Sequence, residues 1–158
     1  MDGGLVVSPV GVIDEQATFS TPPQESFSRL VVDLKGVTYI KSAGVQAWIR
    51  WTKELGAWAG ESTITFRKLP KIMVEQANNV RSFLPDNYEI ESFFLPLFCE
   101  ECDTLKTVLI MVSDHAKVED GTVVWMLPQE VCHGPMEMDV LGKTYFAVVE
   151  QSLLKSAI

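Results

Sequence analysis

Apolar and polar positions along the first hundred residues follow the periods of strands and helices in turn. Residues 30–34 are β-branched and largely apolar on both faces, which predicts a buried central strand. Apolar positions at helical spacing predict a helix from Ser42 to Leu55, with Ser42 as its N-cap and Gly56 at its C-cap. The other elements predicted here are an edge hairpin or bent strand at 5–13, a strand at 63–66, a helix between Pro70 and Pro85, and a strand at 88–95.

The pattern changes after residue 96. Strand and helix alternate twice before this point, which predicts a mostly parallel or mixed sheet with helices packed on it. Beyond it, three β-rich stretches with turns between them predict an antiparallel meander; they are residues 105–112, 122–127 and 144–149. We therefore predict an α/β fold with two parts, a mixed-sheet domain over residues 1–96 and a small antiparallel β subdomain over residues 97–158.

The composition narrows the classes of partner. Of 158 residues, 47% are hydrophobic, and 21 acidic against 13 basic side chains give a formal net charge of −8. Phosphate binding depends on clustered Lys and Arg, so this balance argues against a nucleic-acid partner. The first residues form no basic region, and apolar runs such as 108–112 are far too short to cross a bilayer. We therefore expect a cytoplasmic protein that does not insert into membranes.

Residues 31–45 carry the most specific motif in the sequence. A hydrophobic strand ends in Asp-Leu at Asp33, a loop follows, and Ser42 and Gly44 open a helix in a Ser-x-Gly pattern. With the order of elements over residues 5–95, this motif resembles the STAS domain, the family named for sulphate transporters and anti-sigma-factor antagonists. The resemblance implies a STAS-like sheet packed with helices. It also implies a non-enzymatic module of bacterial signal transduction that acts through protein–protein docking.

In that family the serine at the helix start is the phosphorylation switch, and here the matching residue is Ser42. Lys41 stands where the family has an aspartate, which reverses the local charge. The resemblance places partner binding at Lys41, Ser42, Gly44 and Trp48, with an anti-sigma factor or serine kinase as the partner. An accessory subunit of a transport system is the alternative, and homo-oligomerisation stays open. The other interpretation of Ser42 is a simple helix N-cap without a regulatory role.

The three cysteines form a second candidate site. Cys99 and Cys102 have the spacing of a zinc knuckle, and Cys132 follows about thirty residues later beside His133. The arrangement resembles a degenerate zinc ribbon, with Cys99, Cys102, Cys132 and His133 as candidate metal ligands and His115 as an alternative fourth donor. The cofactor is then either none or zinc, because missing ligands sharply reduce zinc affinity. A metal-binding regulatory protein is a further alternative, and a thioredoxin-like redox role is a weaker one.

The sequence contains little that indicates catalysis. It has no Gly-rich phosphate loop, no His-Glu-x-x-His helix and no nucleophile elbow. Asp114 and His115 could form an acid–base pair, but their place between a strand and a turn favours solvated polar residues. We therefore expect no enzymatic activity.

Overall fold

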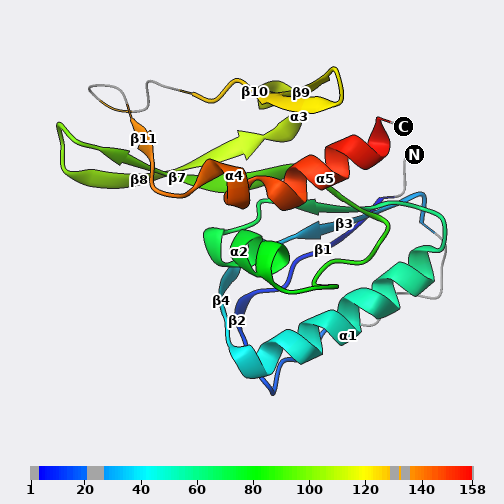
Figure 1. Ribbon diagram of the computed structural model, residues 1–158. Coiled ribbons are helices and arrows are strands. Elements are labelled where there is room, and N and C mark those ends of the chain that lie inside the picture. Colours follow the sequence, from blue (N-terminus) through cyan, green and yellow to red (C-terminus); the bar gives the residue numbers. More distant parts are fainter. Residues whose placement is uncertain (1–3, 21–26, 129–131, 133–135, 158) are drawn as a thin grey trace.

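A four-stranded parallel sheet forms the centre of the molecule (Figure 1). The computed structural model describes residues 4–20, 27–128, 132 and 136–157. The strand order is β1-β3-β5-β6, and the strands are β1 (Gly4–Val7), β3 (Arg29–Asp33), β5 (Ile64–Arg67) and β6 (Tyr88–Ile90). The strands predicted at 30–34 and 63–66 are confirmed as β3 and β5. Together with the helices that connect these strands, the sheet confirms the predicted α/β class.

The first apolar segment is a bent strand and not a hairpin. β2 (Gly11–Ile13) does not pair with β1; it pairs in parallel with β4 (Val37–Ile40), just as β1 pairs with β3. The register shifts between Gly11 and Val12. Gly11 has a φ of 90°, a conformation that glycine adopts without steric cost. The bend therefore produces a second, two-stranded sheet beside the main one.

Two helices follow the parallel strands, and their ends differ from the predicted ones. α1 (Ser42–Ala59) begins one residue earlier than a Ser42 N-cap would place it, because Lys41 is its N-cap residue and accepts the first helical hydrogen bonds through its carbonyl. The helix continues through Gly56, whose missing side chain leaves room for the turn at Pro85, and ends at Gly60. α2 (Lys71–Asn79) is shorter than predicted.

The rest of the chain forms a second layer above α2 (Figure 1). An antiparallel sheet in the order β11-β7-β8 contains β7 (Ser92–Cys99), β8 (Thr104–Met111) and β11 (Glu137–Met138). β9 (Ala116–Glu119) and β10 (Thr122–Trp125) form a hairpin. The short α3 (Val112–His115) precedes this hairpin, and α4 (Gly142–Tyr145) and α5 (Ala147–Ser156) end the described chain. The meander prediction is therefore wrong for residues 144–149, which are helical.

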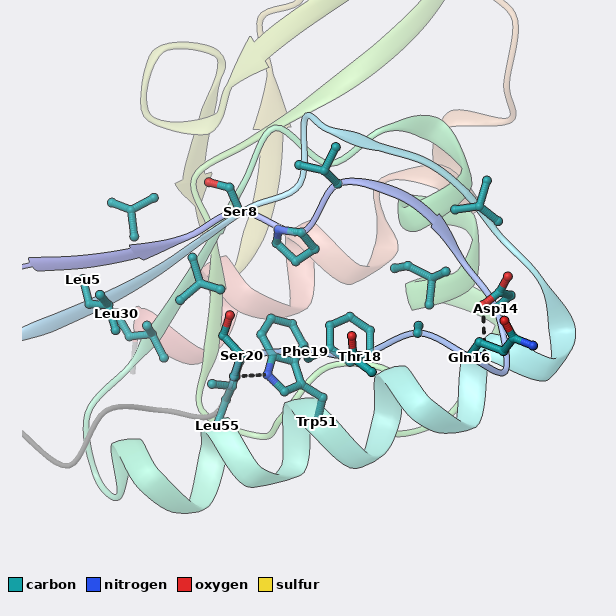
Figure 2. A pocket seen from close by; sticks show the side chains of 17 residues that line it. Leu5, Ser8, Asp14, Gln16, Thr18, Phe19, Ser20, Leu30, Trp51 and Leu55 are labelled. Carbon is teal, nitrogen blue, oxygen red and sulfur yellow. Dashed lines mark hydrogen bonds between the residues drawn. The ribbon is translucent and has the colours of Figure 1, made fainter.

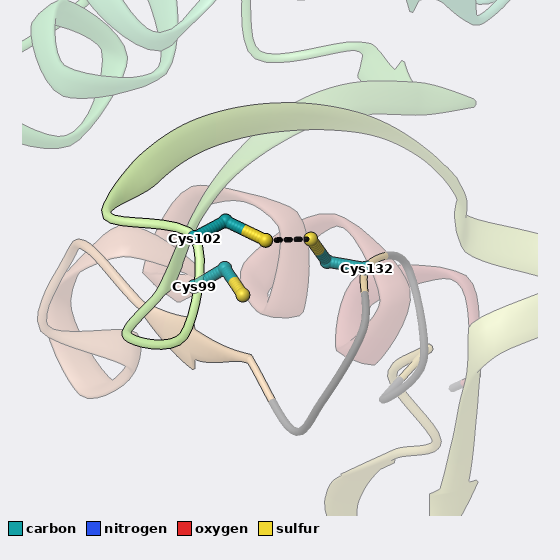
Figure 3. A group of neighbouring side chains, drawn as sticks. All are labelled: Cys99, Cys102 and Cys132. Atoms are coloured by element: carbon teal, nitrogen blue, oxygen red, sulfur yellow. Dashed lines mark hydrogen bonds between the residues drawn. The ribbon is translucent and has the colours of Figure 1, made fainter.

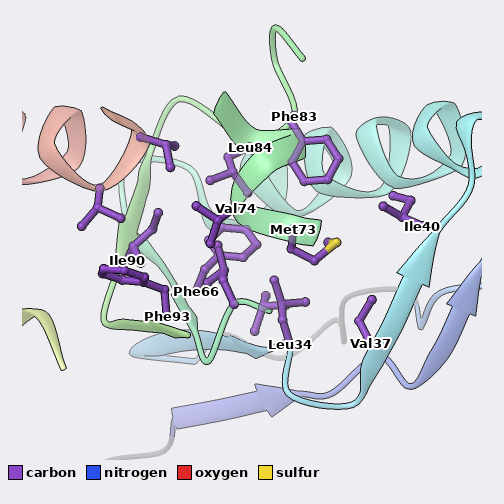
Figure 4. Close-up of a cluster of buried hydrophobic side chains, with 14 of the residues drawn as sticks. Leu34, Val37, Ile40, Phe66, Met73, Val74, Phe83, Leu84, Ile90 and Phe93 are labelled. Atoms are coloured by element: carbon purple, nitrogen blue, oxygen red, sulfur yellow. The ribbon is translucent and has the colours of Figure 1, made fainter. Parts of the chain in front are cut away.

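One hydrophobic cluster joins the two layers. Buried side chains from α2 and the parallel strands meet those of β7 (Figure 4). The same cluster includes Tyr145, Phe146 and Val149 from the C-terminal helices. Phe93 on β7 contacts the rings of Tyr145 and Phe146 edge-on. β7 crosses residue 97, where the sequence predicts a division, and buried residues on both sides of this point share one core.

None of the helices in the described part of the chain combines the length and the apolar character that a membrane crossing requires.

Candidate metal centre and docking surface

The three cysteines lie together at one end of the antiparallel sheet (Figure 3). Their sulfur atoms all lie within 4.8 Å of one another, and the Cys102 and Cys132 Sγ atoms are 3.2 Å apart. Cys99 is buried, whereas Cys102 and Cys132 are half-buried. The spacing in the sequence correctly identified this group, although thirty residues separate the knuckle from Cys132.

The strand register explains why the cysteines meet. Cys99 is the last residue of β7 and pairs with Thr104, so Cys102 lies in the tight turn between β7 and β8. Asp103 in this turn has a φ of 48°, a left-handed conformation that aspartate tolerates better than most residues. β11 pairs with the end of β7, opposite Leu97 and Phe98, and so brings the segment that holds Cys132 back to the turn.

The donor set matches a soft metal ion. Three thiols at this separation could supply three of the four ligands of a zinc ion. The hydrogen bond with Cys132, and then partial burial and the neighbouring Cys99, raise the pKa of the Cys102 thiol to about 11. A cation would have to displace this proton on binding, since the thiolate is the ligand. Thus Cys99, Cys102 and Cys132 fit zinc, while His133 lies outside the described residues.

His115 and Asp114, the two other candidate polar residues, lie outside the cysteine cluster. His115 Nδ1 is 2.9 Å from the Met126 carbonyl oxygen, and the histidine is not in the cysteine group. The Asp114 side chain is exposed at the surface of α3. Among the described residues, neither side chain joins the cysteine group, so the alternative fourth metal donor and the acid–base pair gain no geometric support.

The predicted partner-binding residues divide into exposed and buried ones. Lys41 and Ser42 are exposed at the start of α1, and the Ser42 side chain caps no helix N–H because it occupies the first helical position. Gly44 is buried against β2: a Cβ there would lie 2.3 Å from the Ile13 carbonyl oxygen. The glycine therefore serves the close packing of α1 on β2. The prediction of Ser42 as N-cap is wrong, because Lys41 fills that position.

Trp48 belongs to the core and not to the surface. Its side chain is fully buried, and its indole N–H donates a 2.8 Å hydrogen bond to the Phe83 carbonyl. Trp51, which helical spacing places beside it, is also buried and donates to the Ser20 carbonyl. The prediction that Trp48 contributes to partner binding is therefore corrected, and Phe19 packs on the rings of both tryptophans.

Sequence reasoning missed an apolar surface on β2 and β4. Val12 and Tyr39 pair across these strands and are each about half exposed, at 49% and 52%. Val10, 80% exposed, lies over the turn before β4, where its Cγ2 is 3.0 Å from the position of a Cβ on Gly36. The Lys41 N–H donates to the Ile13 carbonyl, so the start of α1 lies at the end of the same strand pair. Val10, Val12, Tyr39, Lys41 and Ser42 together are called the β2–β4 surface below.

A cavity of about 720 Å³ lies between the β1–β2 strand, the segment after β2, and α1 (Figure 2). Its lining mixes core side chains such as Leu30 and Leu55 with polar ones such as Ser8 and Thr18. Asp14 is the one titratable side chain among the described residues that line it, and its carboxylate accepts a hydrogen bond from the Gln16 N–H. The described lining therefore holds no pair of acid–base groups.

Comparison with known proteins gives no match: no family model, no curated protein and no solved structure is similar to this chain.

Proposed function

We propose that this protein is a non-enzymatic regulatory module that docks another protein on the β2–β4 surface. The observation that carries the proposal is the exposed pair of Val12 and Tyr39 beside Lys41 and Ser42. Exposed apolar side chains that lie together mark interaction sites more often than scattered ones do. The resemblance to STAS domains points independently to Ser42, the residue that matches the family's switch serine.

The start of α1 suits a charge-controlled contact. A helix N-terminus carries unpaired N–H groups and a partial positive charge, so it stabilises an added phosphate. Ser42 is exposed at the first position of this 18-residue helix, with Lys41 beside it. Phosphorylation of Ser42 would place a double negative charge at the edge of the apolar pair. The added charge would change the affinity of a docked partner for this surface, and this change in affinity is the proposed switch.

The partner class follows from the resemblance: an anti-sigma factor or serine kinase of a bacterial cytoplasm. An accessory role in a transport system would use the same surface with a transporter component as partner. In each case docking and not catalysis is the activity, and the acidic net charge of −8 fits a protein partner better than a nucleic acid.

Site-specific crosslinking tests the proposal. A photoreactive amino acid at Ser42 should crosslink one protein in the producing cells, because this position lies within the contact. The same amino acid at Leu105, which is 58% exposed on β8 in the other layer, is the matched control. A specific adduct from position 42 alone supports the docking surface. Equal adducts from both positions, or adducts from position 105 alone, contradict it.

The cysteine cluster supports a second candidate function, that of a metal-binding regulatory protein. Cys99, Cys102 and Cys132 would hold a zinc ion, which would tie the β7–β8 turn to the segment before β11. We expect weak binding because three ligands bind zinc less firmly than four. Elemental analysis after dialysis against a mild chelator tests this: one firmly retained zinc ion per chain would show a stronger site than proposed. Loss of zinc in Cys99→Ser would assign the metal to the cluster.

A further inference from the structure

The cysteine cluster also offers a covalent chemistry that needs no metal. The Cys102 and Cys132 sulfurs are 3.2 Å apart and face each other, whereas a disulfide bond is about 2.05 Å long (Figure 3). The remaining approach of about 1.2 Å is within reach of rotation about the two cysteine side chains. We propose that Cys102 and Cys132 form a reversible oxidation site, at which a peroxide joins the two sulfurs in an intramolecular disulfide.

The reaction balances with a peroxide as the oxidant. Because the pKa of the Cys102 thiol is raised to about 11, its thiolate is a minor form at neutral pH, and the oxidation should speed up as the pH rises. The thiolate of one cysteine attacks a peroxide oxygen, which breaks the O–O bond and leaves a sulfenic acid on that sulfur and water after proton transfer. The second thiolate then attacks the sulfenic sulfur and expels hydroxide, which leaves as water once protonated. The two thiols lose two protons and two electrons, and one hydrogen peroxide molecule becomes two water molecules. A dithiol such as dithiothreitol reverses the step by thiol–disulfide exchange.

The pairing is specific for geometric reasons. Cys102 and Cys132 are half-buried, so a small oxidant reaches them, whereas Cys99 is fully buried. Cys99 is also held by the register of β7 with β8, which limits its movement toward another sulfur. Cys102 lies in a turn, and Cys132 lies outside the helices and strands. Cys99 also hydrogen-bonds Cys102, but its burial and its place in the β7–β8 register leave Cys102 and Cys132 as the pair that joins.

The proposal is independent of the docking function and needs no zinc, which would compete for the same thiols. The disulfide would close a ring that contains β8, α3, β9 and β10. It would also tie the turn after β7 to the segment before β11, and thereby fix the end of the antiparallel sheet. Metal-free protein is the appropriate sample, because thiolates bound to a metal ion are held away from the oxidant.

Peroxide treatment of the full-length, chelator-treated protein tests the proposal. Titration of free thiols should fall from three to one, and the monomer should become lighter by about two mass units. Peptide mapping should link Cys102 to Cys132, and dithiothreitol should restore all three thiols. A link that contains Cys99, an intermolecular dimer as the main product, or sulfinic acid without a link would overturn the proposal.

Three single variants sharpen the test. After peroxide treatment, Cys99→Ser should still lose both of its thiols and give the same linked peptide. Any intramolecular link in Cys102→Ser or Cys132→Ser should form more slowly than the wild-type link. Mapping of the wild-type protein decides the question even if a variant fails to fold. Loss of the link in Cys99→Ser, with retained circular dichroism, would contradict the assignment, and so would a Cys99–Cys132 link that forms in Cys102→Ser as fast as the wild-type link.

Discussion

Asp33 shows how one residue of the STAS-like motif serves the fold. It ends β3, and its carboxylate accepts a 2.8 Å hydrogen bond from Arg67 Nε, lies 3.8 Å from Lys68 Nζ and accepts the Lys35 N–H. Burial raises the pKa of Asp33, but the Arg67 hydrogen bond, the Lys35 N–H and the two positive charges outweigh it, so the pKa is lowered. The aspartate therefore joins the ends of β3 and β5, beside the turn that leads to β4.

The pH dependence of stability should reflect this carboxylate. Since the folded-state pKa lies below that of the unfolded chain, the stabilisation is complete above about pH 4 and is lost as the pH falls through the folded-state pKa. Asp33→Asn should lower the free energy of unfolding by about 1–3 kcal/mol at neutral pH. The difference from the wild type should shrink toward pH 2.

Urea unfolding at pH 7 and pH 2.5 measures this effect. Glu61→Gln, which changes an exposed carboxylate, is the matched control and should leave the free energy of unfolding nearly unchanged at both pH values. A deficit of Asp33→Asn that is equally large at both pH values would show that the charge of Asp33 does not provide the stabilisation.

Among the elements, the C-terminal helices show where sequence patterns fail. Apart from Ala147, residues 144–149 are aromatic or β-branched and predict a strand, yet Tyr145, Val148 and Val149 are buried in α4 and α5, and Phe146 is buried between these helices. Long-range hydrogen bonds favour this arrangement: Tyr145 Oη donates to the Phe94 carbonyl. Such partners lie some fifty residues away, so local propensity could not indicate them. By contrast, the apolar run at residues 30–32 predicts a strand that the tertiary contacts keep as β3.

The candidate sites also differ in whether a local sequence pattern or a long-range contact determines them. The spacing of Cys99 and Cys102 is a local pattern, and it predicts that the two thiols lie close together because only a short turn separates them. The exposure of Val12 and Tyr39 depends on the bend between β1 and β2. Likewise the burial of Trp48 depends on the Phe83 carbonyl, thirty-five residues away. Neither fact follows from a pattern within one element.

Asn78 connects α2 to both C-terminal helices. Its amide group donates to the Tyr145 carbonyl and accepts the Val148 N–H, each at 2.9 Å. Asn78→Ala should therefore lower the free energy of unfolding by about 2–3 kcal/mol, because two partly buried backbone groups lose their partners. Asn79→Ala removes the exposed neighbouring side chain and is the control. Denaturant unfolding should separate the two variants, and equal stabilities would contradict the role of Asn78.

At the scale of the whole molecule, the shared core predicts that both layers unfold together. Val149 on α5 is fully buried in the cluster that also contains Val32 of β3. Val149→Ala should cost about 1–3 kcal/mol, and the slowest-exchanging amides of β3 and of β7 should then exchange faster by the same factor. Hydrogen exchange followed by mass spectrometry measures both. Faster exchange confined to residues after 97 would instead support two independent units divided there.

Docking on the β2–β4 surface is the central claim for the whole molecule, and the affinity of the crosslinked partner for Ser42→Asp and Ser42→Ala tests it most directly. Both variants remove the hydroxyl, but only Asp adds a negative charge at the start of α1. Isothermal titration calorimetry should show that Ser42→Asp shifts the binding free energy by about 1–3 kcal/mol, with Ser42→Ala close to the wild type. Equal affinities for the wild type and both variants would contradict the account and move the interface elsewhere.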